Sequence, residues 1–169
     1  MSFELDGVDL CHPGGHVALR GIPLAARQGE KVDPETEEEP GKILPEMRYG
    51  EMARTHEIPH RPYYGTNDAT PLFAWLIAEM IGWTGDSTLY AEFAPHARRA
   101  FEWIERYGDL DGDGLIEYTT EQGGESHIRH KVWKDSAISL HYPDGRPASG
   151  RIAAVEVQGY AYAAYARMA

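Results

Sequence analysis

Three segments of the chain carry apolar residues at the spacing of an amphipathic helix. The first spans residues 71–81, with Thr70 as N-cap, Pro71 at the first helical position and an end at Gly82. The second starts near Pro95 and ends at Gly108, and the third, rich in Ala and Tyr, spans residues 152–168. The predicted buried stripes consist of Leu72, Phe73, Leu76, Ile77, Met80 and Ile81 in the first helix and of Phe93, Ala97, Ala100, Phe101 and Ile104 in the second.

The remaining segments have weaker patterns. Residues 1–16 show no clear period and are expected to be an irregular N-terminal segment, followed by one domain over residues 17–169. Residues 17–28 indicate a short helical piece interrupted by Gly21 and Pro23, and residues 29–41 have the acidic composition of a solvated loop. Residues 42–53 favour an extended ribbon because Pro45 and Gly50 interrupt any long helix. The pattern therefore predicts a mainly α fold with short extended segments and long loops.

Composition narrows the class of protein. With 169 residues, 42% of them hydrophobic and 11% aromatic, the chain can bury the core of one domain. The net charge of −11 argues against a protein that neutralises nucleic-acid phosphates or acidic lipid headgroups. Cys11 is the single cysteine, which excludes an internal disulfide and a four-thiolate zinc site. Because the sequence has neither a basic-then-apolar leader nor about 20 consecutive apolar residues, we expect a cytoplasmic protein with no membrane partner.

An acidic loop at residues 109–120 matches the start of a calcium-binding loop. Oxygen ligands stand at its positions 1, 3 and 5, and Gly114 stands at position 6. Position 12 is Thr120 rather than the bidentate Glu, so that another carboxylate would have to complete the shell. The same residues are also typical of a metal-free turn, because Gly adopts positive φ easily and the Asp side chain forms hydrogen bonds with its own backbone. Both interpretations stand, and the candidate ligands are Asp109, Asp111, Asp113 and Glu117.

Aromatic and carboxylate residues are concentrated in the segments between the predicted helices. Aromatic faces stack on the apolar faces of sugar rings, and carboxylates accept hydrogen bonds from sugar hydroxyls or perform the acid and base chemistry of glycosidic cleavage. The alternative is that the aromatic residues pack in the core and the carboxylates cap helices. The residues concerned are Tyr63, Tyr64, Asp68, Trp133, Asp135 and Glu156.

Five motifs, in this order and spacing, resemble the amylo-alpha-1,6-glucosidase family of glycogen-debranching proteins. The resemblance extends over roughly residues 20–165, and the motifs that carry it are GKILPEMR at 41–48, PYYGTNDATPLF at 62–73, DLDGDGLIEY at 109–118, WKDS at 133–136 and EVQGY at 156–160. The family belongs to the six-hairpin glycosidases, whose (α/α)6 barrel is shared with glucoamylase. The resemblance implies a toroid of helical hairpins that binds sugar in a funnel lined by the loops at one end.

The resemblance also implies roles for individual residues. Asp135 resembles the general acid, which needs a pKa raised by a partly apolar pocket to which Trp133 would contribute. Asp68 resembles the carboxylate that binds hydroxyls of the non-reducing glucose, although it is equally suited to cap the following helix. Tyr64 is a further candidate for contact with the sugar.

Two pairs of polar residues complete the implied binding site. Glu46 and Arg48 are candidates for sugar binding, and an ordinary ion pair explains them equally well. Glu156 and Gln158 resemble polar groups of the pocket on the last helix. Because they stand two residues apart, they lie about 200° apart around that helix, and only a wide groove or a helix end would let both face a sugar.

The sequence departs from the family pattern at three motifs. Pro45 stands where the family has His, the residues 130–132 (HKV) stand where it has Asn-Gln-Gly, and Ile138 replaces a second Asp. An inverting glycosidase also needs a base about 6.5–9.5 Å from the acid, and the family's base lies beyond residue 169.

The length of the chain also indicates that it matches only part of the family's barrel. Twelve helices of about 11–12 residues would use most of the 169 residues, so the chain matches about half a toroid. Its open edge would then be buried by a second copy or by the missing half.

Two functions follow from the sequence. One is an inverting alpha-glucosidase or debranching enzyme acting on alpha-glucans or oligosaccharides, with no required cofactor and with Asp135 as acid. The other is a non-catalytic carbohydrate-binding or assembly module, in which the aromatic and carboxylate groove binds sugar without turnover.

Overall fold

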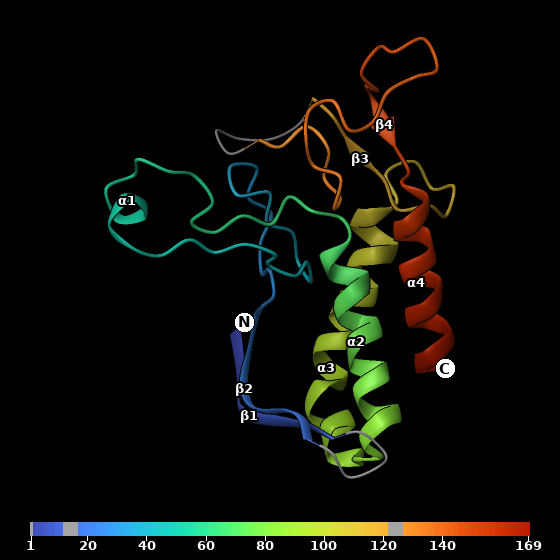
Figure 1. Ribbon diagram of the computed structural model, residues 1–169. Helices are drawn as coiled ribbons and strands as arrows, with labels where there is room; N and C mark the ends of the chain where they lie inside the picture. The colour runs from blue at the N-terminus through green and yellow to red at the C-terminus, as the bar shows by residue number, and fades with distance from the viewer. Residues whose placement is uncertain (1, 12–16, 122–126) are drawn as a thin grey trace.

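The fold is mainly helical, as the sequence predicts. The computed structural model describes the backbone of residues 2–11, 17–121 and 127–169 and the side chains of residues 28–121 and 127–169. Its helices are α1 (Glu51–Arg54), α2 (Ala69–Thr84), α3 (Ser87–Trp103) and α4 (Val155–Met168), and a π-helical turn, η1 (Ile104–Gly108), continues α3 (Figure 1). Helix α2 packs against both α3 and α4, so the three long helices lie side by side. None of the described helices combines the length and the apolar character needed to span a bilayer.

Helix α2 starts and ends at other residues than predicted. It begins at Ala69, and the hydroxyl of Thr70 does not cap it but accepts a hydrogen bond from the backbone N–H of Ile43 at 3.0 Å. The helix continues past Gly82 to a left-handed residue, Gly85, whose φ of 65° suits glycine. Since α2 is packed on two sides, its buried face is broad and includes Ala residues, whereas Leu72 and Leu76 of the predicted stripe are exposed.

Helix α3 begins two turns before the predicted start near Pro95. The carboxylate of Asp86 caps it by accepting a hydrogen bond from the N–H of Thr88 at 2.8 Å. Pro95 lies inside the helix on its exposed side. Because water can reach the carbonyl that the proline leaves without a donor, the helix continues through it. The helical run ends at Gly108, as predicted.

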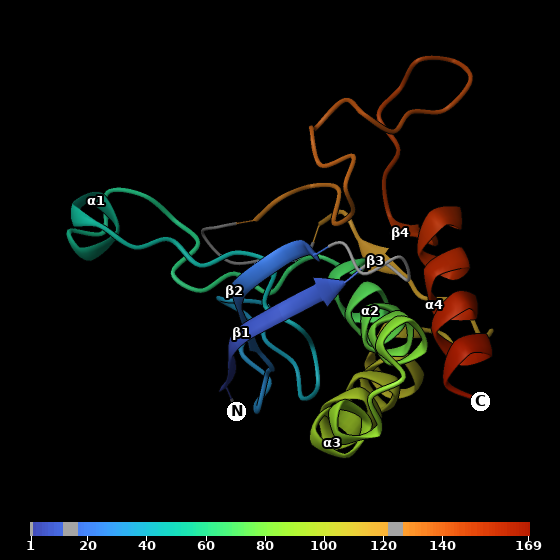
Figure 2. The ribbon, with the colours of Figure 1, turned by 60° about the horizontal axis from the view of Figure 1, so that its bottom comes forward.

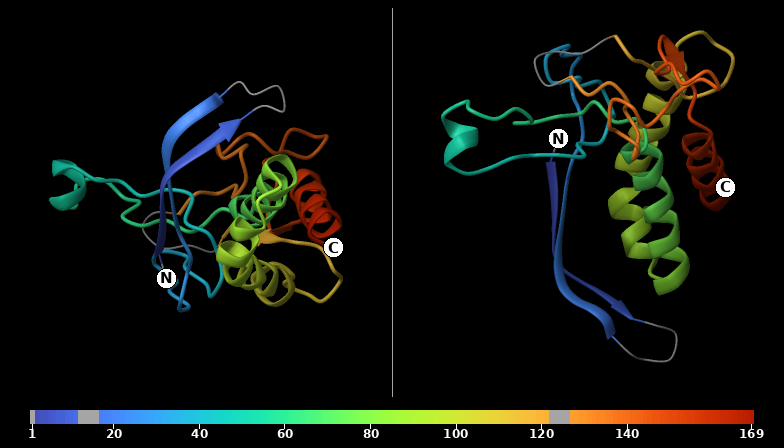
Figure 3. Two further views of the ribbon diagram at one scale, coloured as in Figure 1. Left: turned by 90° about the horizontal axis from the view of Figure 1, so that it is seen from below. Right: turned by 45° about the horizontal axis from the view of Figure 1, so that its top comes forward.

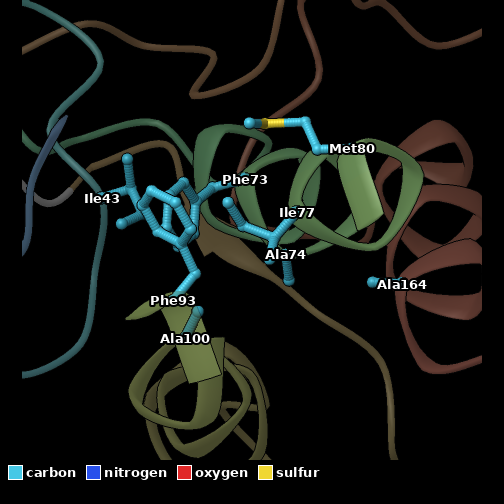
Figure 4. Close-up of a cluster of buried hydrophobic side chains, with 8 residues drawn as sticks. All are labelled: Ile43, Phe73, Ala74, Ile77, Met80, Phe93, Ala100 and Ala164. Carbon is cyan, nitrogen blue, oxygen red and sulfur yellow. The ribbon is translucent and has the colours of Figure 1, made fainter. Parts of the chain in front are cut away.

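The core lies between α2, α3 and the extended segment that precedes them. Figure 4 shows Phe73, Phe93 and Ile43 in one buried cluster, with small Ala residues on the helices. A second cluster continues the core toward the loops. It contains Trp103, Ile104, Ile116, Tyr118, Val132, Ala154, Val157 and Ala161.

The N-terminal region forms strands, which corrects the prediction of an irregular segment and a short helical piece. Strands β1 (Ser2–Cys11) and β2 (Val17–Arg27) pair in antiparallel fashion, with register shifts that place Pro23 opposite a bulge. Pro23 has no N–H and is tolerated there, because a two-stranded ribbon consists of edge strands only. Met1 and residues 12–16, which the predicted irregular segment includes, lie outside the described residues. The ribbon lies on the opposite side of α2 and α3 from α4 (Figure 2).

The loops gather at the end of the bundle where α2 begins (Figures 1 and 3). The extended prediction for residues 42–48 agrees with isolated β-bridges from Gln28 to Ile43 and from Glu46 to Tyr63, whereas Glu51–Arg54 forms the single-turn α1. A short sheet of β3 (Tyr118–Thr119) and β4 (Arg151–Ile152) leads into α4, which therefore starts three residues later than predicted. This end of the bundle holds the candidate site.

Candidate functional site

A cavity of about 310 Å³ lies among the loops that precede α2 and the loop that contains Trp133. It brings together four of the residues that the sequence singles out, namely Glu46, Asp68, Trp133 and Asp135. This volume is at the lower end of the range for small-molecule sites. The other lining residues are Pro45, Tyr63, Thr66, Ile128, His130 and Val132.

Backbone hydrogen bonds hold the segments of this cavity together. The N–H of Tyr63 donates to the carbonyl of Glu46 at 3.1 Å, and the N–H of Asn67 donates to the carbonyl of Lys131 at 2.7 Å. The ring of Tyr63 lies so close to Gly65 that a Cβ at that position would be 2.2 Å from the phenol oxygen. The site therefore depends on main-chain pairing and on one close approach, so its geometry is set by the scaffold.

Asp68 places a half-buried carboxylate in the cavity. Burial raises its pKa above the usual value, while the hydroxyl of Thr66 and the backbone N–H groups of Ala69 and Trp133 act in the opposite direction. Asp68 occupies the N-cap position of α2 but makes no side-chain capping hydrogen bond. The capping interpretation is therefore not supported, and the carboxylate lines the cavity instead.

Glu46 forms the charged wall of the cavity. Arg48 donates to it through Nε, and Nδ1 of His60 lies 2.9 Å from its other oxygen. Burial raises the pKa of Glu46, but Arg48 and His60 outweigh this effect and hold the pKa below its ordinary value. Glu46 is thus ionised near neutral pH, and Arg48, which does not line the cavity, acts as its ion-pair partner.

Trp133 and Asp135 are open to solvent. Trp133 is 64% exposed, and Asp135 is exposed as well. The partly apolar enclosure expected around a general acid is therefore not formed by the residues described here. An exposed indole beside carboxylates is nevertheless available for stacking on a ligand that enters from solvent.

Tyr63 and His130 also line the cavity. Tyr63 is one of the aromatic residues between the predicted helices, but the sequence assigns no specific role in the site to it or to His130. Tyr63 is 1% exposed and His130 is fully buried. Two signals in the sequence could have found them. Tyr63 is the immediate neighbour of Tyr64 in an extended segment, where successive side chains point to opposite sides. His130 stands at a position where the chain departs from the family pattern.

Three other predicted residues do not line this cavity. Tyr64 is buried, and its N–H donates to the carbonyl of Thr36 at 2.8 Å. The amide of Gln158 is bonded to both the N–H and the carbonyl of Ile116, at 2.9 and 2.8 Å, so it has a structural task. Glu156 is half-buried in the first turn of α4 and acts electrostatically on Tyr118.

A second, larger cavity of about 580 Å³ is lined by the acidic loop at residues 32–39 and the end of α3. Its buried ammonium groups have partners. Lys42 lies 3.3 Å from a carboxylate oxygen of Glu39, and Lys131 is paired with Glu37. The pKa of Lys42 is lowered, because the effect of burial exceeds the opposing effect of these carboxylates. We place the candidate site in the smaller cavity, because that cavity contains Glu46, Asp68, Trp133 and Asp135.

The acidic loop at residues 109–120 brings its four candidate ligands together. One carboxylate oxygen from each of Asp109, Asp111, Asp113 and Glu117 lies within 4.8 Å of the others. Asp109 also accepts hydrogen bonds from the N–H groups of Gly112 and Gly114, at 2.7 and 2.9 Å, as in a tight turn. Glu117 is buried, and this burial, reinforced by the charges of Asp111 and Asp113, raises its pKa.

No protein-family model matches the chain, and a search of curated proteins finds no match either. The chemistry of the site therefore has to be argued from the residues themselves. The cavity offers carboxylate acceptors, buried polar groups and an exposed indole, a combination suited to a small ligand that carries hydroxyl groups.

Proposed function

We propose that the chain is a carbohydrate-active protein of the amylo-alpha-1,6-glucosidase type, with the action of an inverting alpha-glucosidase on alpha-glucans or oligosaccharides. The observation that carries this proposal is the cavity, which brings together Glu46, Asp68, Trp133 and Asp135, although Glu46 and Asp135 are 89 positions apart in the sequence. The three long helices are then hairpin elements of a partial (α/α)6 toroid, with the sugar bound at the end where the loops gather.

The lining favours a neutral polyhydroxylic ligand. Three carboxylates accept hydrogen bonds from hydroxyl groups, and the exposed indole of Trp133 offers a face for a sugar ring. An anionic ligand would be repelled, because the charged residues of the lining are Glu46, Asp68 and Asp135. The net charge of −11 disfavours phosphorylated ligands in the same way.

Each carboxylate takes one role in the proposed reaction. Asp135 donates a proton to the glycosidic oxygen, and Asp68 accepts hydrogen bonds from hydroxyls of the terminal glucose. Glu46, held ionised by Arg48 and His60, orients another hydroxyl. The proposal assigns the base that activates water to a residue outside these 169.

The test is the release of glucose from maltooligosaccharides and from a branched limit dextrin. Because the proposed base lies outside these residues, the assay contains sodium formate as a substitute base. We then expect turnover by the unchanged chain and a loss of at least about a hundredfold in Asp135→Asn, because the variant cannot donate the proton. Asp144→Asn is the matched control, since Asp144 is exposed and pairs only locally with Arg146. Equal turnover by the unchanged chain and Asp135→Asn would contradict the role of Asp135.

The second candidate function is non-catalytic carbohydrate binding. It is favoured by the exposure of Trp133 and Asp135, which leaves the acid without an enclosing pocket. Binding of maltooligosaccharides with no release of glucose, and with equal affinity in Asp135→Asn, would select this function over the first.

For the acidic loop at residues 109–120 we propose a structural calcium ion held by Asp109, Asp111, Asp113 and Glu117. The residues fit such an ion because the Oε2 atom of Glu117 is buried without a hydrogen bond among the described residues. The guanidinium of Arg151, which pairs with Asp111 and lies 3.9 Å from this Oε2, would be displaced by the ion. Hard oxygen ligands are those that calcium prefers. The ion would neutralise carboxylates that otherwise repel one another.

Calcium binding is tested by thermal unfolding with and without the ion. At about a hundred times the dissociation constant, calcium is expected to raise Tm by roughly 5–10 °C, because binding to the folded state alone adds about 2.7 kcal/mol. The rise should vanish in Asp113→Asn and persist in Asp144→Asn. A Tm that calcium leaves unchanged would favour the metal-free turn.

A further inference from the structure

We infer that the hydroxyl of Tyr63 and Nε2 of His130 form hydrogen bonds with hydroxyl groups of a ligand in the smaller cavity. This inference rests on the proposed function, because it names the residues that distinguish a sugar from another ligand of that size. Both residues line the cavity together with Asp68.

Tyr63 buries a polar atom that the described protein does not satisfy. Its side chain is 1% exposed, and its hydroxyl has no hydrogen-bond partner among the described residues. The ring is held by stacking on His60, with centroids 4.3 Å apart, and by its close approach to Gly65. Burial and the surrounding carboxylates Glu37, Glu46, Asp135 and Asp68 raise the pKa of Tyr63, so the hydroxyl keeps its proton.

His130 presents a second unsatisfied atom. Its Nδ1 lies 3.2 Å from the hydroxyl of Tyr118, while Nε2 has no hydrogen-bond partner among the described residues. Burial and the charge of Arg129 lower the pKa of His130 against a smaller opposing effect of the Ala137 carbonyl, so the ring is neutral near pH 7.

The hydroxyl of Tyr118 leaves both tautomers of His130 open, because a hydroxyl can donate to Nδ1 or accept from it. Nε2 is therefore a donor in one tautomer of the neutral ring and an acceptor in the other. A ligand hydroxyl, which both donates and accepts, can pair with Nε2 in either case.

These groups together select hydroxyl groups. A ligand hydroxyl can accept from Nε2 of His130 or donate to it, and neighbouring hydroxyls of a sugar can donate to a carboxylate such as that of Asp68. An ammonium group cannot accept, and an apolar group can do neither. Buried polar atoms without partners are costly and are rare in folded proteins. A ligand that pairs them is therefore bound more tightly than one of equal size that leaves them unpaired.

The experiment measures maltotriose binding by calorimetry for the unchanged chain, Tyr63→Phe and Tyr165→Phe. Tyr63→Phe removes only the unsatisfied hydroxyl and is expected to weaken binding about fivefold with Tm unchanged or raised. Tyr165→Phe is the control, because its hydroxyl donates to Glu105 away from the cavity, and it should leave the affinity unchanged. In parallel, the ¹⁵N signal of His130 Nε2 should move when maltotriose is added.

Three results would overturn the inference, and they are distinguishable. If the unchanged chain binds maltotriose, Tyr63→Phe binds equally well and the His130 signal stays fixed, the inference fails while the proposed function stands. If the unchanged chain does not bind maltotriose, the proposed function fails and the inference fails with it. A large drop in Tm for Tyr63→Phe would show that the hydroxyl has a partner in the free protein, which also contradicts the inference.

Discussion

At the scale of single residues, the site depends on a position that has no side chain. A Cβ on Gly65 would lie 2.2 Å from the hydroxyl oxygen of Tyr63 and 2.3 Å from its Cζ. We expect Gly65→Ala to destabilise the fold by about 1–3 kcal/mol, since the buried ring would have to move. Gly82→Ala is the control, because nothing lies within 4 Å of its Cβ inside α2, and it should stabilise by about 0.5–1 kcal/mol. Urea unfolding measures both, and equal stability of Gly65→Ala and the unchanged chain would contradict the packing of Tyr63.

Protonation of His130 gives a second prediction at this scale. Because its pKa is lowered in the folded chain, the unfolded chain takes up a proton first as the pH falls below about 6.5. Stability should therefore be fully present above that pH and decrease toward pH 5. His130→Gln should lose less stability than the unchanged chain over the same range, with a remainder from His96, whose pKa is also lowered. Parallel pH profiles for the two proteins would rule out this role of His130.

The residues of the site could be predicted only in part. Glu46, Asp68, Trp133 and Asp135 were selected from their motifs, and they do share one cavity. The sequence alone could not decide whether Tyr63 or Tyr64 lines the cavity. Adjacent residues of an extended segment point to opposite sides, and long-range pairing determines which side faces the cavity. The motif indicated that Gln158 is a polar residue of the pocket. Its structural role could not be predicted, because its partner Ile116 stands 42 residues earlier in the sequence.

At the scale of elements, the helices with a strong apolar period were predictable, while some of their ends were predicted wrongly. Helix α3 is capped by Asp86, which is a local signal, but Pro95 is an equally common residue at a helix start. The ribbon of β1 and β2 cannot be predicted from either strand alone, because Gly21 and Pro23 interrupt the pattern and the backbone hydrogen bonds come from the partner strand. The start of α3 can thus be read from local sequence, whereas the ribbon depends on a pairing that local sequence does not reveal.

Gln158 joins two elements and is open to a direct test. Its amide bonds the backbone of Ile116 in both directions and the carbonyl of Ala154 at 3.2 Å, so it attaches α4 to the strand region. We expect Gln158→Ala to destabilise the chain by about 2 kcal/mol in urea unfolding, because two backbone groups lose a half-buried partner. Gln158→Glu should be no better, since it loses the donors and brings a charge against two carbonyls. A change below about 0.5 kcal/mol in both variants would contradict this role.

At the scale of the whole molecule, the loops that line the candidate cavity lie at one end of the helical bundle (Figure 1). Trp133 lies at the loop end, whereas Trp83 lies near the far end of α2 (Figure 1). The two indoles are almost equally exposed, at 64% and 59%. They are therefore a matched pair of probes for where a ligand binds.

The most direct measurement is an NMR titration of the chain with maltotriose that follows the two indole N–H signals. A carbohydrate site in the cavity predicts a saturable shift of the Trp133 signal, while the Trp83 signal stays in place. If both signals move equally, or if neither moves at high ligand concentration, the cavity is not a carbohydrate site.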